Sequence, residues 1–277
     1  MQISPLLIGA ALSLAAAFSP ALAGPAMTEA APAPLVSHKA LYDLRLVEGA
    51  GTKAPASASG RIAFEFSSAC EGYAQTLRQV VDMQPQEGER QVTETRTATY
   101  EDLKGDGFRF NSATQGGKDE EIDGHAERDA RGALAIALNR PQPFKLNAAD
   151  NVLFPTQHIE NVIAAARRGD KVFLARVYDA SDDGRKIFDV TTIIGKPRLT
   201  PDADKGARTE VLRGLRRWPV ALAYFRSDLR DGQPDYVLSF DLYENGVSSG
   251  LKLDYGDFVL TGELTDIAFP PPAKCRR

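Results

Sequence analysis

The sequence predicts an all-β fold built as one curved, barrel-like, mainly antiparallel sheet. About a dozen segments alternate apolar and polar residues with a period of two, which is typical of antiparallel strands that are wet on one face. Turn residues separate these segments at short spacing, and helical periodicity is confined to one segment. This pattern favours a single sheet over alternating α/β units.

The N-terminal 23 residues predict a secretory signal peptide. Residues 6–18 are apolar or small, and Ala21-Leu22-Ala23 is an A-x-A pattern that predicts cleavage between Ala23 and Gly24. The alternative is a membrane anchor, for which the run falls short of the roughly 20 apolar residues of a spanning helix. We therefore expect a periplasmic protein that does not span a membrane after cleavage.

The charge of the chain indicates no polyanionic partner. The formal net charge is −4, and the signal peptide carries no charged side chain, so the mature chain keeps this value. A slightly negative net charge does not indicate binding to nucleic acid or to an anionic membrane.

The mature chain divides into a leader and one domain. Residues 24–36 are rich in Ala and Pro, which predicts a flexible leader. Residues 37–277 are enough for a single large β domain. The segment 90–102 is strongly polar and is expected to face solvent. The other strands expected in the first half of the domain are 39–46, 60–66, 72–83 and 108–114.

One amphipathic helix is expected at about 156–168. Thr156 is placed to cap its N-terminus and Gly169 to end it. Its apolar stripe must be buried, and we expect it to cover an opening of the curved sheet. The stripe consists of Ile159, Val162, Ile163 and Ala166.

The second half of the domain is expected to contain further strands that pair in hairpins. The segments 171–179 and 186–195 form a hairpin, and the alternation is clearest over 235–267. Asn245-Gly246 predicts a type I′ turn, in which both residues adopt positive φ.

The chain has two cysteines, Cys70 and Cys275. In an oxidising compartment two lone cysteines most simply pair with each other. Two free thiols or a catalytic cysteine are the alternatives, although neither residue lies in a C-x-x-C motif. The bridge would close a loop of about 205 residues, for which chain entropy gives an upper figure of about 5 kcal/mol.

No catalytic residue, metal site or cofactor is predicted. The three histidines lack the spacing of zinc ligands, and no G-x-S-x-G motif is present. The acidic segment 179–184, DASDDG, lacks the ligand spacing and the later Glu of a calcium loop, so a solvated hairpin loop is favoured. An enzyme is the least favoured class.

Four aromatic residues are the candidates for a ligand-binding or partner-binding surface. The hypothesis is that they line the concave side of the sheet, where open barrels hold apolar ligands or a partner's segment. The alternative is that Trp218, the single tryptophan, fills the core. The four are Trp218, Tyr224, Phe240 and Tyr255.

Several long segments resemble the EipB family of alphaproteobacterial cell envelope integrity proteins. They are CEGYAQTLRQ, LFPTQHIENVI, VYDASDDGRK, WPVALAYF and DYVLSFDLYENGVSSGLKLDYGDFVLTGELT, and the resemblance runs from SHKALYDLRL to AKC. It implies a periplasmic β-spiral, an incompletely closed barrel with an inserted helix, similar in shape to lipoprotein-carrier folds. It also implies a disulfide matching Cys70 and Cys275 and a part in maintaining the envelope under stress. The resemblance implies no catalytic residue.

Two functions therefore compete. The favoured one is a non-enzymatic factor that maintains the cell envelope under stress by binding a protein partner or an envelope component. The other is a carrier that holds a lipid or an acyl chain on its concave face. A lipid-sized adduct on the purified protein would distinguish the carrier.

Overall fold

The fold is described from a computed structural model. It describes residues 35–49, 54–117, 119–148, 151–199, 209–228 and 232–275. The predicted signal peptide and all but the last two residues of the predicted leader lie outside these ranges. Leu35 is buried in the core, and the Val36 N–H donates to the Asn245 carbonyl oxygen at 3.0 Å. The packed chain thus includes the two residues before 37.

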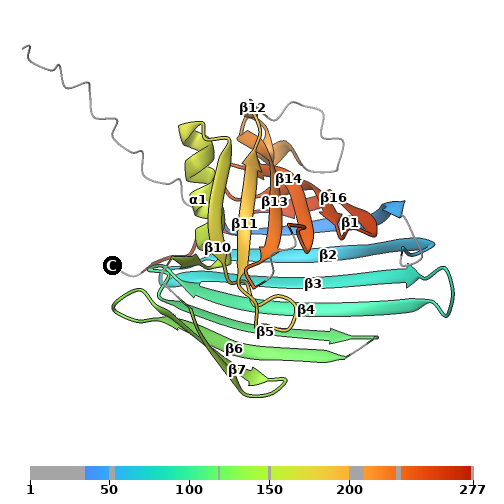
Figure 1. Cartoon of the computed structure of the whole chain (residues 1–277). Helices are drawn as coiled ribbons and strands as arrows, with labels where there is room; N and C mark the ends of the chain where they lie inside the picture. The colour runs from blue at the N-terminus through green and yellow to red at the C-terminus, as the bar shows by residue number, and fades with distance from the viewer. Residues whose placement is uncertain are drawn as a thin grey trace, which may run out of the picture. The chain divides into compact units, whose positions relative to one another are not determined.

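The described residues form one 16-stranded sheet, shown in Figure 1, which confirms the predicted all-β class. The first eight strands are β1 (His38–Gly49), β2 (Ser57–Ser68), β3 (Gly72–Gln84), β4 (Gln91–Asp102), β5 (Gly107–Gln115), β6 (Glu120–Arg128), β7 (Leu134–Arg140) and β8 (Phe144–Ala148). The others are β9 (Val152–Leu153), β10 (Val172–Val177), β11 (Phe188–Ile194), β12 (Arg198–Leu199), β13 (Arg216–Arg226), β14 (Tyr236–Tyr243), β15 (Ser248–Asp254) and β16 (Phe258–Ala268).

Most neighbours in the sheet are also neighbours in sequence, as expected from short hairpins. The order is β8-β7-β6-β5-β4-β3-β2-β1-β16-β15-β14-β13-β11-β10-β9, with β12 paired to β13 off this path. Three pairings on this path differ from the hairpin pattern. β1 pairs antiparallel with β16, which joins the two ends of the domain, β11 pairs antiparallel with β13, and β9 pairs parallel with β10.

The hairpin between β14 and β15 lies where the sequence predicts it, but the turn type is different. Gly246 has a φ of 90°, whereas Asn245 is not among the residues with positive φ. The Tyr243 N–H donates to the Val247 carbonyl oxygen at 2.8 Å, and the Gly246 N–H donates to the Tyr243 carbonyl oxygen at 2.9 Å. This is a three-residue loop with one left-handed residue, so the predicted type I′ turn is wrong.

The described residues contain one α-helix, α1 (Pro155–Arg168), and a short 3₁₀ helix at Thr209–Leu212. Gly169 ends α1 with a φ of 88°, as predicted. Thr156 is not the N-cap, because the helix begins at Pro155 after Phe154. The Thr156 hydroxyl instead donates to Glu101 of β4 at 2.6 Å, and the Thr156 N–H donates to the same carboxylate at 2.8 Å. The anion at the helix N-terminus thus comes from the sheet.

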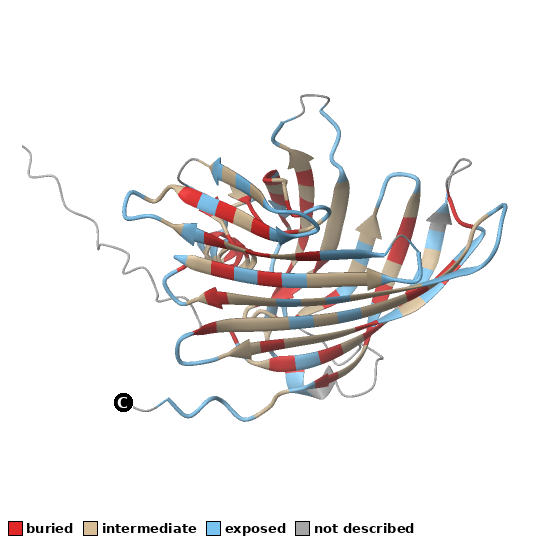
Figure 2. Cartoon of the chain, turned by 90° about the horizontal axis from the view of Figure 1, so that it is seen from below, coloured by how far each residue is buried: buried red, intermediate tan, exposed pale blue. Residues whose placement is uncertain are grey.

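The core lies on one face of the sheet, which we call the inner face because α1 packs against it. Buried and exposed residues alternate along the strands, visible as bands in Figure 2. The largest buried cluster joins Val162 and Ile163 of α1 with Phe66 of β2, Phe188 of β11 and Trp218 of β13. Residues of distant strands thus meet around the helix, as the expected covering of an opening requires.

The acidic loop between β10 and β11 is only partly the solvated loop that the sequence suggests, because Asp182 and Asp183 are exposed while other residues pack against the sheet. Tyr178, Ala180 and Ile187 are buried in a second cluster with Phe108 and Ile136 of β5 and β7. The buried Tyr178 hydroxyl donates to the Gly184 carbonyl oxygen at 2.9 Å. The loop therefore packs against the inner face of the sheet.

Cys70 and Cys275 form a disulfide, which confirms the predicted pairing. Their Cα atoms are 5.4 Å apart, and the two residues are 205 positions apart in sequence. Cys70 lies between β2 and β3, and both cysteines are exposed. The bridge fastens the segment after β16 to the turn between two early strands.

Candidate functional site

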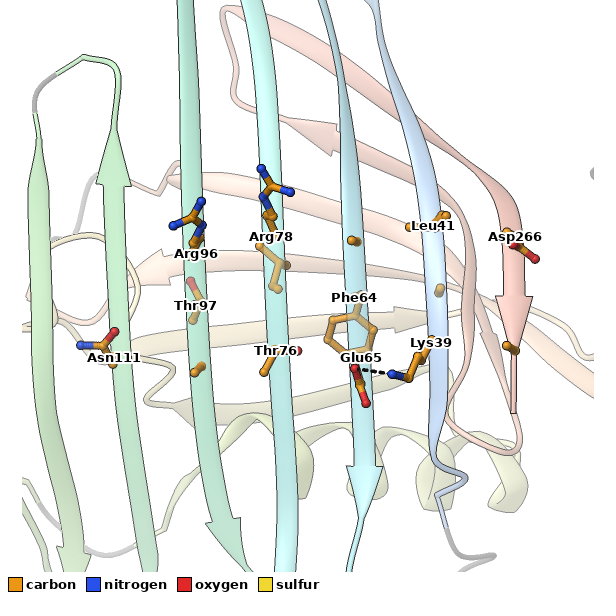
Figure 3. Close-up of a pocket in the computed structure, with 15 residues that line it drawn as sticks. Lys39, Leu41, Phe64, Glu65, Thr76, Arg78, Arg96, Thr97, Asn111 and Asp266 are labelled. Atoms are coloured by element: carbon orange, nitrogen blue, oxygen red, sulfur yellow. Dashed lines mark ion pairs between the residues drawn. The ribbon is translucent and has the colours of Figure 1, made fainter. Parts of the chain in front are cut away.

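A groove of about 590 Å³ lies on the outer face of the sheet, opposite α1, and Figure 3 shows it with the helix behind the strands. Its lining residues come from six adjacent strands, β16, β1, β2, β3, β4 and β5. Neighbouring strands are about 4.8 Å apart, so five steps between strands give a span of roughly 24 Å. The groove is thus long and runs across the strands.

Small side chains in two neighbouring register rows of the outer face create the groove. Ala63 lies opposite Leu41 on one side and Arg78 on the other. Ala98 lies opposite Thr76 and Asn111. The small residues Ala63, Thr76 and Ala98 thus step diagonally across β2, β3 and β4 and form the floor, and the longer side chains beside them form the rim.

Two arginines on the rim give one part of the groove a positive charge. Arg78 and Arg96 both donate to Oε1 of Glu94, at 2.6 Å and 2.7 Å, and both side chains are mostly exposed. The hydrogen bond from Arg78 holds the pKa of Glu94 below its usual value, so this carboxylate is ionised at neutral pH. Two guanidinium groups share one carboxylate, which leaves one positive charge in excess.

The remaining rim has one cation, Lys39, and two carboxylates, Glu65 and Asp266, so the excess of positive charge is local to Arg78 and Arg96. Lys39 forms an ion pair with Glu65 at 3.0 Å, drawn as a dashed line in Figure 3. Asn111 adds an exposed amide on β5. The groove therefore combines a floor of small and apolar groups with an excess of positive charge at Arg78 and Arg96. Such a site suits an elongated ligand that is apolar along its length and anionic at one end.

The structure brings together three of the four aromatic residues predicted to bind a ligand. Trp218, Tyr224 and Phe240 are buried in the cluster that surrounds α1. Trp218 is only 1% exposed, whereas Tyr255 is 41% exposed, lies outside this cluster and stacks on Phe258. The four residues do not form one surface, and their binding role stays a prediction.

Buried titratable groups lie on the inner face, away from the groove. Burial raises the pKa of Glu101 to about 7, although the hydrogen bonds from Thr156 and Gln157 act in the opposite direction. Burial also lowers the pKa of His158 to about 4 and lowers the pKa of His38. These histidines are neutral at neutral pH and pack in the core, where His158 stacks on Phe173.

Two kinds of feature are absent from the described ranges. Within them, no group of three or more His, Cys, Asp or Glu side chains is arranged to hold a metal ion. No helix of the described chain has both the length and the apolar character needed to cross a bilayer.

Sequence reasoning misses the groove because no single segment contains it. The segment now seen as β4 was expected only to be a polar strand facing solvent. Arg96 and Ala98 do point outward. The threonines on the opposite face of the strand are half-buried: Thr95 forms a hydrogen bond with Thr114 of β5, and Thr97 forms one with Ser112. Only the pairing of separate strands brings Ala63 of β2, Thr76 of β3 and Ala98 of β4 next to one another.

Comparisons with known proteins agree with this fold. The model of the EipB-like family matches residues 29–271. The chain is 34% identical over 267 residues to the cell envelope integrity protein EipB of Brucella abortus (strain 2308), covering 94% of this chain and 93% of that protein. It is also similar to the crystal structure of a β-barrel-like protein of a domain of unknown function from Brucella abortus. There the TM-score is 0.79 at 33% identity, covering 86% of this chain and 99% of that chain. With the fold, the inserted helix and the disulfide all in place, the chain belongs to the EipB-like family.

Proposed function

We propose that this protein maintains the integrity of the cell envelope as a non-enzymatic periplasmic binding protein, and that the outer-face groove is its binding site. Membership of the EipB-like family and the name of the Brucella relative support the envelope role. The observation that carries the binding proposal is the groove itself, which crosses six strands and has small residues on its floor beside two arginines.

The ligand that fits this groove best is an envelope lipid with an anionic headgroup. The span of roughly 24 Å exceeds the ~15 Å of one leaflet of a bilayer's hydrocarbon core, so it can hold an acyl chain and a headgroup. The chain would lie on Leu41, Ala63 and Ala98, and the headgroup would meet Arg78 and Arg96. The groove and the aromatic residues of the concave side are thus separate candidate sites.

Filling the floor of the groove tests the proposal. Ala98→Phe places a ring in the groove on an exposed strand position, where an aromatic residue is compatible with β structure. Val92→Phe is the matched control, because Val92 lies on the same strand and the same face but does not line the groove. Both proteins are isolated from the envelope and weighed by native mass spectrometry.

We expect the unmodified protein and Val92→Phe to carry a lipid-sized adduct and Ala98→Phe to lack it. Cells that produce Ala98→Phe at a normal level should also lose resistance to detergent stress. If the unmodified protein carries a polypeptide in the groove and no lipid, the ligand of the groove is a partner protein. Equal adducts and equal protection in both variants would exclude the groove as the binding site.

A further inference from the structure

Exposed apolar side chains gather at one end of the sheet. Val172 of β10 lies opposite Ile193 of β11, and Leu174 follows two residues later on the same face. Leu199 of β12 lies opposite Arg216, on the inner-face side of β13, so it reaches this end of the strands from the other face of the sheet. Each of these four side chains is more than half exposed. Solitary exposed apolar residues are ordinary, but a group of them on adjacent strands marks a contact surface.

Basic side chains surround this apolar group. Lys171 precedes Val172, Lys196 and Arg198 lie between Ile193 and Leu199, and Arg216 lies opposite Leu199. All four are exposed. Among the described residues, none of these four side chains forms a hydrogen bond or an ion pair, so their charges are directed to solvent.

Three acidic side chains of the described residues have partners on this part of the sheet. Asp170 forms an ion pair with Arg168 at 2.9 Å, and Asp189 pairs with Arg176 at 3.6 Å. Glu244 accepts a hydrogen bond from the Arg216 backbone N–H at 3.1 Å. Asp170 and Asp189 are thus paired with other arginines, whereas Glu244 keeps its charge and offsets one of the four cations, which leaves an excess of positive charge among the described residues.

The topology brings these residues to one place. The C-terminal end of α1, the start of β10, the end of β11 and β12 all lie at the upper end of the molecule in Figure 1. We call this surface the basic–apolar rim, defined by Lys171, Val172, Leu174, Ile193, Lys196, Arg198, Leu199 and Arg216. It lies on other strands than the outer-face groove.

We propose that the basic–apolar rim docks the protein reversibly on an anionic lipid bilayer. Peripheral membrane binding combines apolar side chains that enter the headgroup boundary with Lys and Arg side chains that meet anionic lipids, and the rim has both. The formal net charge of −4 conceals this local excess of positive charge. A second copy of the chain is the less suitable occupant, because a symmetric contact would bring two sets of unpaired cations together.

Vesicle binding of the exported, purified protein tests the proposal. Vesicles of phosphatidylcholine alone are compared with vesicles that also contain phosphatidylglycerol, and bound protein is measured by co-sedimentation. The rim variant is Lys196→Glu with Leu199→Ser. The matched control is Lys104→Glu with Leu103→Ser, since Leu103 and Lys104 are an exposed apolar–basic pair in the turn between β4 and β5. Both variants keep the same N-terminus, so any effect of that segment is shared.

We expect binding to the anionic vesicles that weakens as salt is added, and weak binding to phosphatidylcholine alone. Each basic residue near an anionic surface is worth about a fivefold change in partitioning, so the rim variant should bind at least about fivefold more weakly. The control should bind like the unmodified protein. Ala98→Phe should also bind normally, which separates this inference from the proposed function of the groove.

Two results would overturn the inference. One is equal binding of the rim variant and the control. The other is a concentration-dependent dimer in analytical ultracentrifugation that the rim variant abolishes, because the rim would then be covered by a second copy.

Discussion

At the scale of single residues, Glu101 connects the sheet to the helix. Its carboxylate is 1% exposed and accepts hydrogen bonds from the Thr156 hydroxyl and N–H and from the Gln157 N–H. Placing an anion at a helix N-terminus is favourable, whereas burying it is costly. Burial outweighs the hydrogen bonds and raises the pKa of Glu101 to about 7.

Glu101 should make the stability of the protein depend on pH. The folded pKa of about 7 exceeds the 4.5 of an ordinary Glu, so folding favours the protonated form. The resulting stabilisation is fully present below pH 4.5 and is lost as the pH rises through 7. The shift corresponds to about 3 kcal/mol at most.

We expect the free energy of unfolding of the native protein, relative to Glu101→Gln, to fall by about 2–3 kcal/mol between pH 5 and pH 8. Urea denaturation of both proteins at the two pH values measures this difference. Parallel pH dependences of the two proteins would contradict the assignment.

Trp218 is the second residue for which we predict the effect of a substitution on stability. Its ring is 1% exposed and packs in the cluster around α1. Truncation leaves a cavity, so Trp218→Ala should lower the free energy of unfolding by about 3–5 kcal/mol. Tyr255→Ala, at an exposed position, should cost less than about 1 kcal/mol. If Trp218→Ala leaves the melting temperature unchanged while envelope protection falls, the ring lines a binding cleft instead.

At the scale of elements, the strands and the helix could be predicted because period-two and period-3.6 patterns are local. The helix expected at 156–168 is found at Pro155–Arg168. Its cap could not be predicted, because Glu101 approaches from 55 residues away in sequence. The type of the turn at Asn245-Gly246 depends on how β14 and β15 pair. The burial of Tyr178 depends on β5–β7, which the loop itself does not specify.

The C-terminus of α1 offers a test of local strain. Gly169 has a φ of 88°, and a Cβ added there would meet nothing within 4 Å. Gly169→Ala should therefore cost roughly 1 kcal/mol of stability through backbone strain alone. Gly169→Asn should cost less, because Asn tolerates the left-handed conformation better. Thermal denaturation of the two variants compares them, and an equal loss would contradict a conformational origin of the cost.

At the scale of the whole molecule, the disulfide acts on the unfolded chain. Linking residues 205 positions apart limits the unfolded ensemble, with an upper value of about 5 kcal/mol. Cys70→Ser, Cys275→Ser and the double variant should lose similar stability, because each breaks the same bond. Urea denaturation of the three variants checks this. Losses that add in the double variant would show that the cysteines act separately, and two labelled thiols in the native protein would refute the bond.

The pairing of β1 with β16 has a consequence for the time course of folding. At about 5–20 residues per second of synthesis, Cys275 follows Cys70 by roughly 10–40 s. Until β16 and Cys275 reach the same compartment, β2–β8 can pair in succession, but one side of β1 has no partner strand and Cys70 has no partner thiol. A chain that ends early can acquire neither the last strand nor the covalent link. The disulfide therefore distinguishes finished molecules from truncated ones.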